Sequence, residues 1–133
     1  MKIIYKPDDF VYTMPNFNTE WIEAKRYVKH PNIKKRIQWT KKDWMEKAKN
    51  GNIMRFSQIN NLQNISDINE FENLFSEKVE RFILLFSKKE FELPIAVKFP
   101  NGTIDLIAGN TRVTGLRNKG YDPKIWVIET FNL

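Results

Sequence analysis

Two short apolar runs flank a tight-turn signal in the last third of the chain, and they constrain the fold more than any other feature. Residues 94–99 and 104–108 are both rich in aliphatic and aromatic side chains, and Pro100-Asn101-Gly102-Thr103 separates them. Asn-Gly is a strong hairpin signal because both residues tolerate a positive φ. The pattern predicts an antiparallel β-hairpin.

The hairpin is expected to continue into a helix through a single glycine. Gly109 follows the second strand, and residues 113–119 have the pattern of a short helix that ends at Gly120. A third strand is predicted over residues 124–129. The order strand, turn, strand, glycine, helix, strand predicts a small mixed sheet in an α+β fold.

The junction at Gly109 is the place where the sequence suggests chemistry. A glycine lets the backbone turn sharply and approach a ligand closely. The first amides of the next helix, at Asn110, Thr111 and Arg112, lack intrahelical acceptors and lie at its positive end, where phosphate binds well. Arg112 adds a forked cation, and the other two side chains add donors or cap the helix. The alternative is an ordinary glycine turn with Asn110 as N-cap and Arg112 in solvent.

Three helices are predicted before the hairpin, over residues 19–30, 41–49 and 66–88. Asn18 or Thr19 is the expected N-cap of the first. The second opens at Thr40, whose spacing to Asp43 is that of a capping box. Residues 19–90 are therefore expected to be mainly helical, and residues 91–133 to hold the hairpin, the phosphate-binding turn, the short helix and the last strand.

The segment 66–88 carries the clearest helical period. Its apolar residues recur at intervals of three and four: Ile68, Phe71, Phe75, Val79, Phe82, Ile83 and Phe86. Such a stripe can form a ligand groove, but we expect it to be core. Residues 1–18 are expected to form an extended arm or edge strand, and residues 53–59 a short strand. No linker or repeat divides the 133 residues, which predicts a single domain.

Composition excludes much catalytic chemistry. The chain has no cysteine, which removes disulfides, thiol nucleophiles and cysteine-based zinc sites. With His30 as the one histidine, no multi-histidine metal site can form within one chain, and no metal site is predicted. The apolar run 82–86 is far shorter than the ~20 residues of a membrane span. Because the start also lacks a signal-peptide pattern, we expect a cytoplasmic protein without a membrane partner.

The formal net charge of +6 is concentrated in residues 19–56, which hold eleven Lys and Arg against four acids. Tryptophan and tyrosine are interleaved with these charges, a pattern typical of nucleic-acid binding. The segment predicts contact with DNA or RNA through Lys34, Lys35, Arg36, Trp39, Lys41 and Lys42. The alternative is a solvated, lysine-rich pair of helices whose tryptophans face the core.

Residues 104–116, Ile-Asp-Leu-Ile-Ala-Gly-Asn-Thr-Arg-Val-Thr-Gly-Leu, resemble the core of the ParB/sulfiredoxin superfamily. In that family an (L/I)IAGxxR segment leads from a strand into a helix and binds nucleotide phosphates. Gly109 and Arg112 match its two most informative places, and the resemblance spans residues 91–129. It implies a ParB/sulfiredoxin-like fold in which Gly109, Asn110, Thr111 and Arg112 bind the phosphates of ATP or another nucleoside triphosphate, with Mg²⁺.

Departures from the family pattern narrow this implication. Chromosome-partitioning ParB proteins carry Gly-Glu-Arg-Arg followed by a helix-turn-helix domain, whereas this sequence carries Gly-Asn-Thr-Arg and ends at Leu133, so a partitioning clamp is not expected. Sulfiredoxins place a catalytic cysteine where Asn110 stands, which excludes their chemistry. The family's free serine kinases carry Gly-His-Thr-Arg. The nearest analogy is therefore an ATP-dependent phosphotransferase that acts on a nucleotide, a nucleic acid or a small hydroxyl substrate.

The Gly-Asn-Thr-Arg variant is similar to that of small bacteriophage proteins with this core. That similarity implies a part in phage DNA modification in a bacterial host.

Phosphoryl transfer needs charge neutralisation and usually a carboxylate that holds Mg²⁺ or accepts a proton. The acids nearest the motif are Glu90, Glu92 and Asp105. Kinases of the family use a carboxylate upstream of the motif, which favours Glu92. Asp105 is the second candidate, on the strand face opposite its apolar neighbours. The alternative is that each of these acids is exposed to water without a role, and His30, remote from the motif, is expected at a helix end.

Two other function classes stay open at this point. The chain could be a non-catalytic DNA- or protein-binding module whose nucleotide site has decayed, because the family's catalytic cysteine and histidine are missing. A nuclease is the third class, although the sequence contains no cluster of metal-binding acids.

Overall fold

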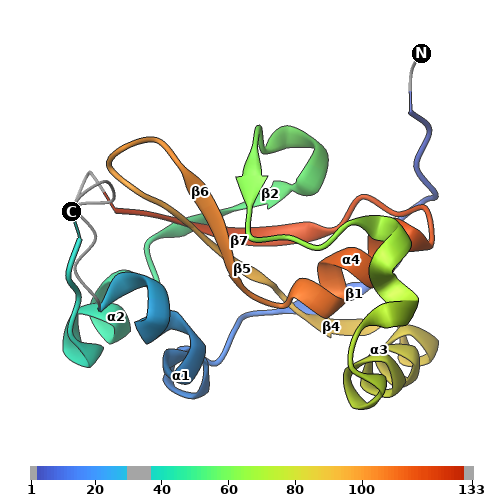
Figure 1. Ribbon diagram of the computed structural model, residues 1–133, viewed down its shortest axis with the longest axis horizontal. Helices are drawn as coiled ribbons and strands as arrows, with labels where there is room; N and C mark the ends of the chain where they lie inside the picture. The colour runs from blue at the N-terminus through green and yellow to red at the C-terminus, as the bar shows by residue number, and fades with distance from the viewer. Residues whose placement is uncertain (1–2, 30–36, 131–133) are drawn as a thin grey trace.

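The structure, a computed structural model, describes residues 3–29 and 37–130 and has an α+β fold (Figure 1). Its strands are β1 (Val11–Thr13), β2 (Gly51–Arg55), β3 (Leu62–Gln63), β4 (Glu90–Glu92), β5 (Ile95–Lys98), β6 (Ile104–Ala108) and β7 (Lys124–Glu129). Its α-helices are α1 (Phe17–Val28), α2 (Lys41–Lys47), α3 (Ser76–Lys88) and α4 (Asn110–Asn118). Two short 3-10 helices, η1 (Phe56–Gln58) and η2 (Ile68–Asn73), complete the described elements.

The main sheet is mixed and has the strand order β2-β7-β5-β6-β3. The predicted hairpin forms its centre, with β5 antiparallel to β6, and β7 returns parallel to β5 after α4. A separate two-stranded sheet pairs β1 in parallel with β4. The α+β class, the hairpin, the short helix and the last strand are thus confirmed, and residues 1–18 contribute β1.

The turn of the hairpin differs in detail from the prediction. Gly102 has φ of +87°, while Asn101 is not among the described residues with positive φ. The amide of Gly102 donates to the Phe99 carbonyl at 2.9 Å, and the Phe99 amide donates to Thr103 at 2.8 Å. One left-handed glycine is therefore sufficient to reverse the chain in this longer loop.

The predicted helix over 66–88 is wrong in one respect, because the chain breaks it into η2 and α3 at Leu74 and Phe75. The reason lies in the packing against α4. Phe71 of η2 and Phe82 of α3 are both buried, with ring centroids 5.1 Å apart, and both rings contact Gly115 so closely that a Cβ there would lie within 3 Å of each. The break lets both segments turn a ring onto the same helix.

Smaller differences concern the helix ends. Helix α1 begins earlier than predicted because Asn16 is its N-cap, with Oδ1 accepting the Thr19 amide at 3.2 Å. The capping box of Thr40 and Asp43 at the start of α2 is confirmed. The expected strand over 53–59 begins at Gly51 and ends at Arg55. Helix α2 ends at Lys47, two residues before the predicted end. The region 19–90 is less helical than expected, since it also provides β2, β3 and part of the smaller sheet.

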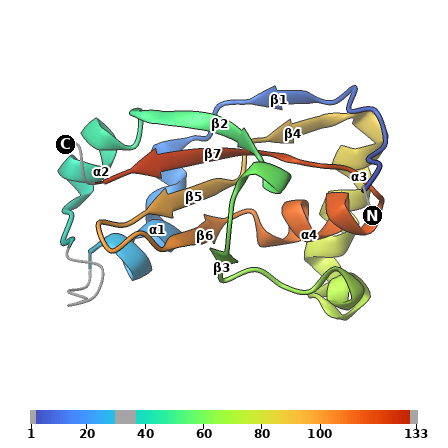
Figure 2. The same ribbon diagram turned by 90° about the horizontal axis from the view of Figure 1, so that it is seen from above.

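The helices cover different parts of the sheet. In Figure 2, α1 and α2 lie toward one end of the strands and α3 and α4 toward the other. Two buried tryptophans tie the first group to the core: Trp44 Nε1 donates to the Phe17 carbonyl at 2.7 Å, and Trp126 Nε1 donates to the Ala48 carbonyl at 2.9 Å. Within the described ranges, no helix has the length and apolar character needed to cross a membrane.

Candidate nucleotide-phosphate site

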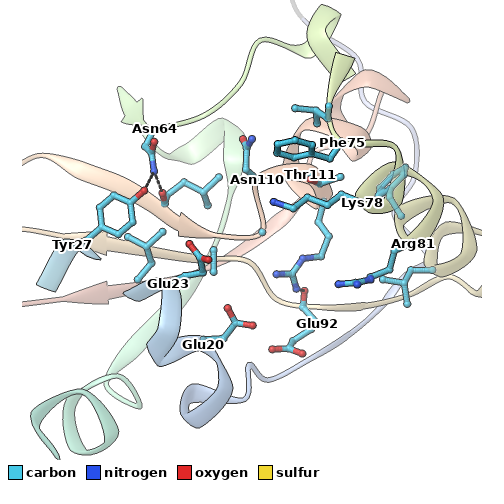
Figure 3. Close-up of a pocket in the computed structure, with 18 residues that line it drawn as sticks. Glu20, Glu23, Tyr27, Asn64, Phe75, Lys78, Arg81, Glu92, Asn110 and Thr111 are labelled. Carbon is cyan, nitrogen blue, oxygen red and sulfur yellow. Dashed lines mark hydrogen bonds between the residues drawn. The ribbon is translucent and has the colours of Figure 1, made fainter. Parts of the chain in front are cut away.

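A cleft of about 650 Å³ opens where β6 ends and α4 begins (Figure 3). Its walls come from α1, α3, β4, β6 and the first turn of α4, and the loops before η2 and α3. Segments as far apart in the chain as Glu20 and Arg112 therefore meet here. All four residues of the predicted phosphate turn, Gly109, Asn110, Thr111 and Arg112, line the cleft.

Gly109 makes the predicted turn possible. Its φ is +90°, and a Cβ at this position would lie 2.8 Å from Pro94 Cβ and 2.9 Å from Arg112 Nη2. The helical hydrogen bonds of α4 begin with the Val113 amide, which donates to the Gly109 carbonyl at 3.0 Å. No side chain of residues 3–29 and 37–130 caps α4. The first amides of α4 therefore keep the positive end of the helix without an internal cap.

Arg112 reaches into the cleft and is fixed by the main chain. Its Nη1 donates to the carbonyl oxygen of Glu92 at 2.6 Å. Burial lowers the pKa of Arg112, and the nearby carboxylates of Glu20 and Glu92 oppose that shift. An arginine stays protonated under these conditions, so the cleft holds a partly desolvated positive charge.

The side chain of Asn110 forms hydrogen bonds to the loop before η2, and its contact with phosphate stays a prediction. Its Oδ1 accepts the Ser66 amide at 3.0 Å, and its Nδ2 donates to Ser66 Oγ at 2.8 Å. These bonds fasten the loop before η2 to the start of α4. The alternative in which Asn110 is the N-cap of the helix is wrong, because Gly109 occupies that position.

Three carboxylates also line the cleft. Glu20 and Glu23 project from α1, and Glu92 stands at the end of β4 (Figure 3). Glu92 Oε1 accepts the amide of Asn16 at 3.0 Å, which holds β4 against the start of α1. Burial raises the pKa of Glu20. The neighbouring Glu92 and Glu23 add to this rise, and Arg112 opposes it.

Two further cations enter the cleft from α3. Lys78 and Arg81 line the cleft, as Arg112 does. Figure 3 shows Lys78 and Arg81 on the side of the cleft across from Glu20 and Glu23. The sequence interpretation missed these two residues and also Glu20 and Glu23. Within each pair the two residues are three positions apart, which places them on one face of their helix. Nothing in the sequence indicates that the two helices face each other.

Asp105 does not join the site. It is 5% exposed on β6 and is not among the cleft-lining residues, unlike Glu92. The alternative of an exposed Asp105 is wrong, because Asp105 and its neighbour Leu106 are both buried in the strand. Of the two predicted catalytic acids, only Glu92 lies beside the phosphate turn.

The basic segment also differs from the prediction. Trp39 is 6% exposed and Trp44 is fully buried, so neither ring can stack on a base, which corrects the assignment of Trp39 to a nucleic-acid surface. Lys41 and Lys42 are exposed in the first turn of α2. His30 and the predicted contacts Lys34, Lys35 and Arg36 lie outside the described residues. Nucleic-acid contact through this segment stays a prediction, without its aromatic component.

No protein-family model, no curated protein and no solved structure matches this chain. In the part of the chain that the structure describes, no three His, Asp or Glu side chains come close enough together to hold a metal ion.

Proposed function

We propose that this cleft binds the phosphates of a nucleoside triphosphate and transfers a phosphoryl group to a hydroxyl acceptor. The observation that carries the proposal is the meeting of Arg112 and the uncapped first turn of α4 with the carboxylates of α1 and β4. Phosphoryl transfer is catalysed mostly by positioning and by neutralisation of charge, and the cleft has groups for both tasks.

The cationic side suits a chain of phosphates. A guanidinium offers a rigid fork of donors that matches phosphate oxygens, and the amides of Asn110, Thr111 and Arg112 add donors at the positive end of α4. Lys78 and Arg81 bring two more positive charges into the same cleft. In a partly water-excluded cleft these charges act more strongly than they do in bulk water.

The acidic side suits the acceptor. A carboxylate with a raised pKa is a better proton acceptor than an ordinary surface glutamate, and Glu20 has such a shift in a cleft beside cations. In the proposed reaction, Glu20 takes the proton of the acceptor hydroxyl as its oxygen bonds to the terminal phosphorus and the nucleoside diphosphate leaves. Arg112, Lys78 and Arg81 neutralise the phosphoryl oxygens.

The residues present also fit Mg²⁺ bound in the manner usual for nucleotides. That ion needs one or two protein carboxylates when phosphates and water supply its other ligands, so the lack of a three-acid cluster in the described ranges is compatible with it. Glu92 is the residue that would hold it, which leaves Glu20 free to accept the proton. When bound, it would neutralise developing charge on the phosphates.

Calorimetric titration of the protein with ATP, CTP and GTP in the presence of Mg²⁺ tests the phosphate site. We expect at least one of them to bind, and Arg112→Ala to weaken that binding about 10- to 100-fold, because a charged hydrogen bond contributes about 1.5–3 kcal/mol. Arg112→Lys keeps the charge but loses the fork, and should recover only part of the affinity.

Arg117→Ala is the matched control for this experiment. Arg117 lies on the same helix, but its guanidinium stacks on the Phe56 ring at 3.9 Å and does not line the cleft. Its removal changes the net charge by the same amount and should leave nucleotide affinity unchanged. Absence of binding by all three nucleotides, or equal affinities for wild type and Arg112→Ala, would contradict the proposal.

A further inference from the structure

Phe75 presents an exposed aromatic ring to the same cleft. It is 77% exposed, although it lies in the phenylalanine-rich stripe whose other rings largely pack into the core. It lines the cleft, and in Figure 3 its ring lies beside Asn110 and Thr111. Exposure of a whole phenyl ring to water is unfavourable, and the other phenylalanine rings of this stripe are buried or partly buried.

The backbone that carries this ring is firmly held on both sides. Leu74 packs against the cluster of Phe71, Phe82 and their neighbours. The carbonyl of Phe75 accepts the amides of Lys78 at 3.0 Å and of Val79 at 3.1 Å, which makes Phe75 the first residue of the turn that starts α3. The ring is therefore presented by a rigid support, and the break in the predicted helix at Leu74 and Phe75 is what directs it to the cleft.

The surroundings of the ring select a particular kind of partner. Lys78 Nζ lies 5.4 Å from the ring centroid and is also a cleft-lining cation. A flat apolar surface next to a positive charge is complementary to a planar ring attached to a phosphate chain. The carboxylates Glu20 and Glu92 lie at the far end of the cleft from Phe75 (Figure 3).

We infer that Phe75 is the stacking platform for the base of the bound nucleotide, an assignment that rests on the proposed function. The base lies on the ring at the start of α3, and the phosphates run past Lys78 toward Arg112. The terminal phosphate then points to the carboxylates of α1 and β4, where the acceptor is deprotonated. Because every base has an apolar face, such stacking adds affinity with little preference among bases.

Calorimetric titration with ATP and with inorganic tripolyphosphate, each with Mg²⁺, separates the base from the phosphates. We expect Phe75→Ala to weaken ATP binding about 10-fold, as loss of a base–aromatic stack does, and to leave tripolyphosphate binding unchanged. Phe75→Trp should restore ATP binding, and ATP should quench the added tryptophan more than it quenches the wild-type protein. Ile83→Ala is the control, since Ile83 is 54% exposed on α3 but does not line the cleft.

Each remaining outcome decides between the two proposals. If wild-type protein binds tripolyphosphate as tightly as ATP, or if Phe75→Ala weakens both ligands equally or neither, the platform is refuted while the phosphate site stands. If wild-type protein binds neither ligand, the proposed function fails and the platform fails with it. Phe75 is exposed, so its replacement should not prevent folding.

Discussion

Glu20 occupies an unusual position for a carboxylate near the surface. It projects from α1 into a cleft that also holds Glu23 and Glu92, and burial raises its pKa despite the attraction of Arg112. A charge kept in such surroundings lowers the stability of the folded state unless a ligand or an opposite charge compensates for its desolvation. Groups of this kind are concentrated at functional sites.

The raised pKa of Glu20 predicts how its replacement changes stability. The folded state binds a proton at Glu20 more tightly than the unfolded chain does. The contribution of Glu20 to stability is therefore greatest below its unfolded pKa and is lost as pH rises through its folded pKa. Glu20→Gln removes this loss, so urea unfolding should find the variant more stable than wild type at neutral pH, with a difference that shrinks as the carboxyl becomes protonated.

The same variant separates stability from activity. If Glu20 is the proton acceptor, Glu20→Gln should lower the rate of phosphoryl transfer about 10²- to 10⁴-fold while it raises stability. Glu23→Gln, one turn further along α1, should change the free energy of unfolding little, because Glu23 pairs with Arg26 at 3.4 Å and both side chains are at least half exposed. A Glu20→Gln protein that is less stable than wild type at neutral pH would refute this interpretation.

The strand–turn–helix element around Gly109 depends on two separate properties of glycine. One is its φ of +90°. The other is the lack of a Cβ, because a Cβ would collide with Pro94 and Arg112. Gly102 in the hairpin has a similar φ of +87°, but a Cβ there would meet nothing within 4 Å. The two glycines therefore form a natural comparison.

Alanine at each glycine should separate the two properties. Gly102→Ala carries only the cost of left-handed backbone, about 1–2 kcal/mol. Gly109→Ala carries the same cost and must also displace Pro94 and Arg112, so it should lower the free energy of unfolding further and weaken ATP binding. Urea denaturation and calorimetry measure both effects. Equal stability losses and unchanged ATP affinity in both variants would show that the close approach at Gly109 is unimportant.

At the scale of the whole molecule, a buried carboxylate helps to hold the N-terminal segment to the sheet. The side chain of Asp8 is 7% exposed, and its Oδ2 accepts from Arg55 Nη1 at 2.7 Å and from Tyr12 Oη at 3.0 Å. Arg55 Nη1 also donates to the Asp122 carbonyl at 2.8 Å. This cluster joins the segment before β1 to β2 and to the loop before β7.

Removal of the Asp8 carboxylate should lower the stability of the folded protein. Asp8→Ala leaves Arg55 and Tyr12 without their shared acceptor, and we expect it to reduce the free energy of unfolding by about 1–3 kcal/mol. Asp9→Ala is the control, because the adjacent Asp9 pairs with Lys89 at 2.6 Å with both side chains more than half exposed. Thermal unfolding of the two variants tests the difference, and equal losses would contradict the role of Asp8.

Local patterns predicted the elements that depend on near neighbours in the chain. The hairpin, the turn at Gly109, the helix after it and the capping box at Thr40 all follow from residues within a few positions of each other. The break at Leu74 could not be predicted in this way, because the apolar period continues through it and the cause is contact with Gly115, forty residues later.

The α+β class, the order of the last elements and the place of Gly109 and Arg112 follow from local sequence patterns, because turn and period signals are short-range. Tertiary structure alone decided which side chains share the cleft. It brought Glu20, Lys78 and Phe75 to the phosphate turn, buried Asp105 in the sheet and Trp39 in the core. The physical reason is that burial and electrostatic surroundings depend on which faces of distant elements meet, and no local pattern specifies that meeting.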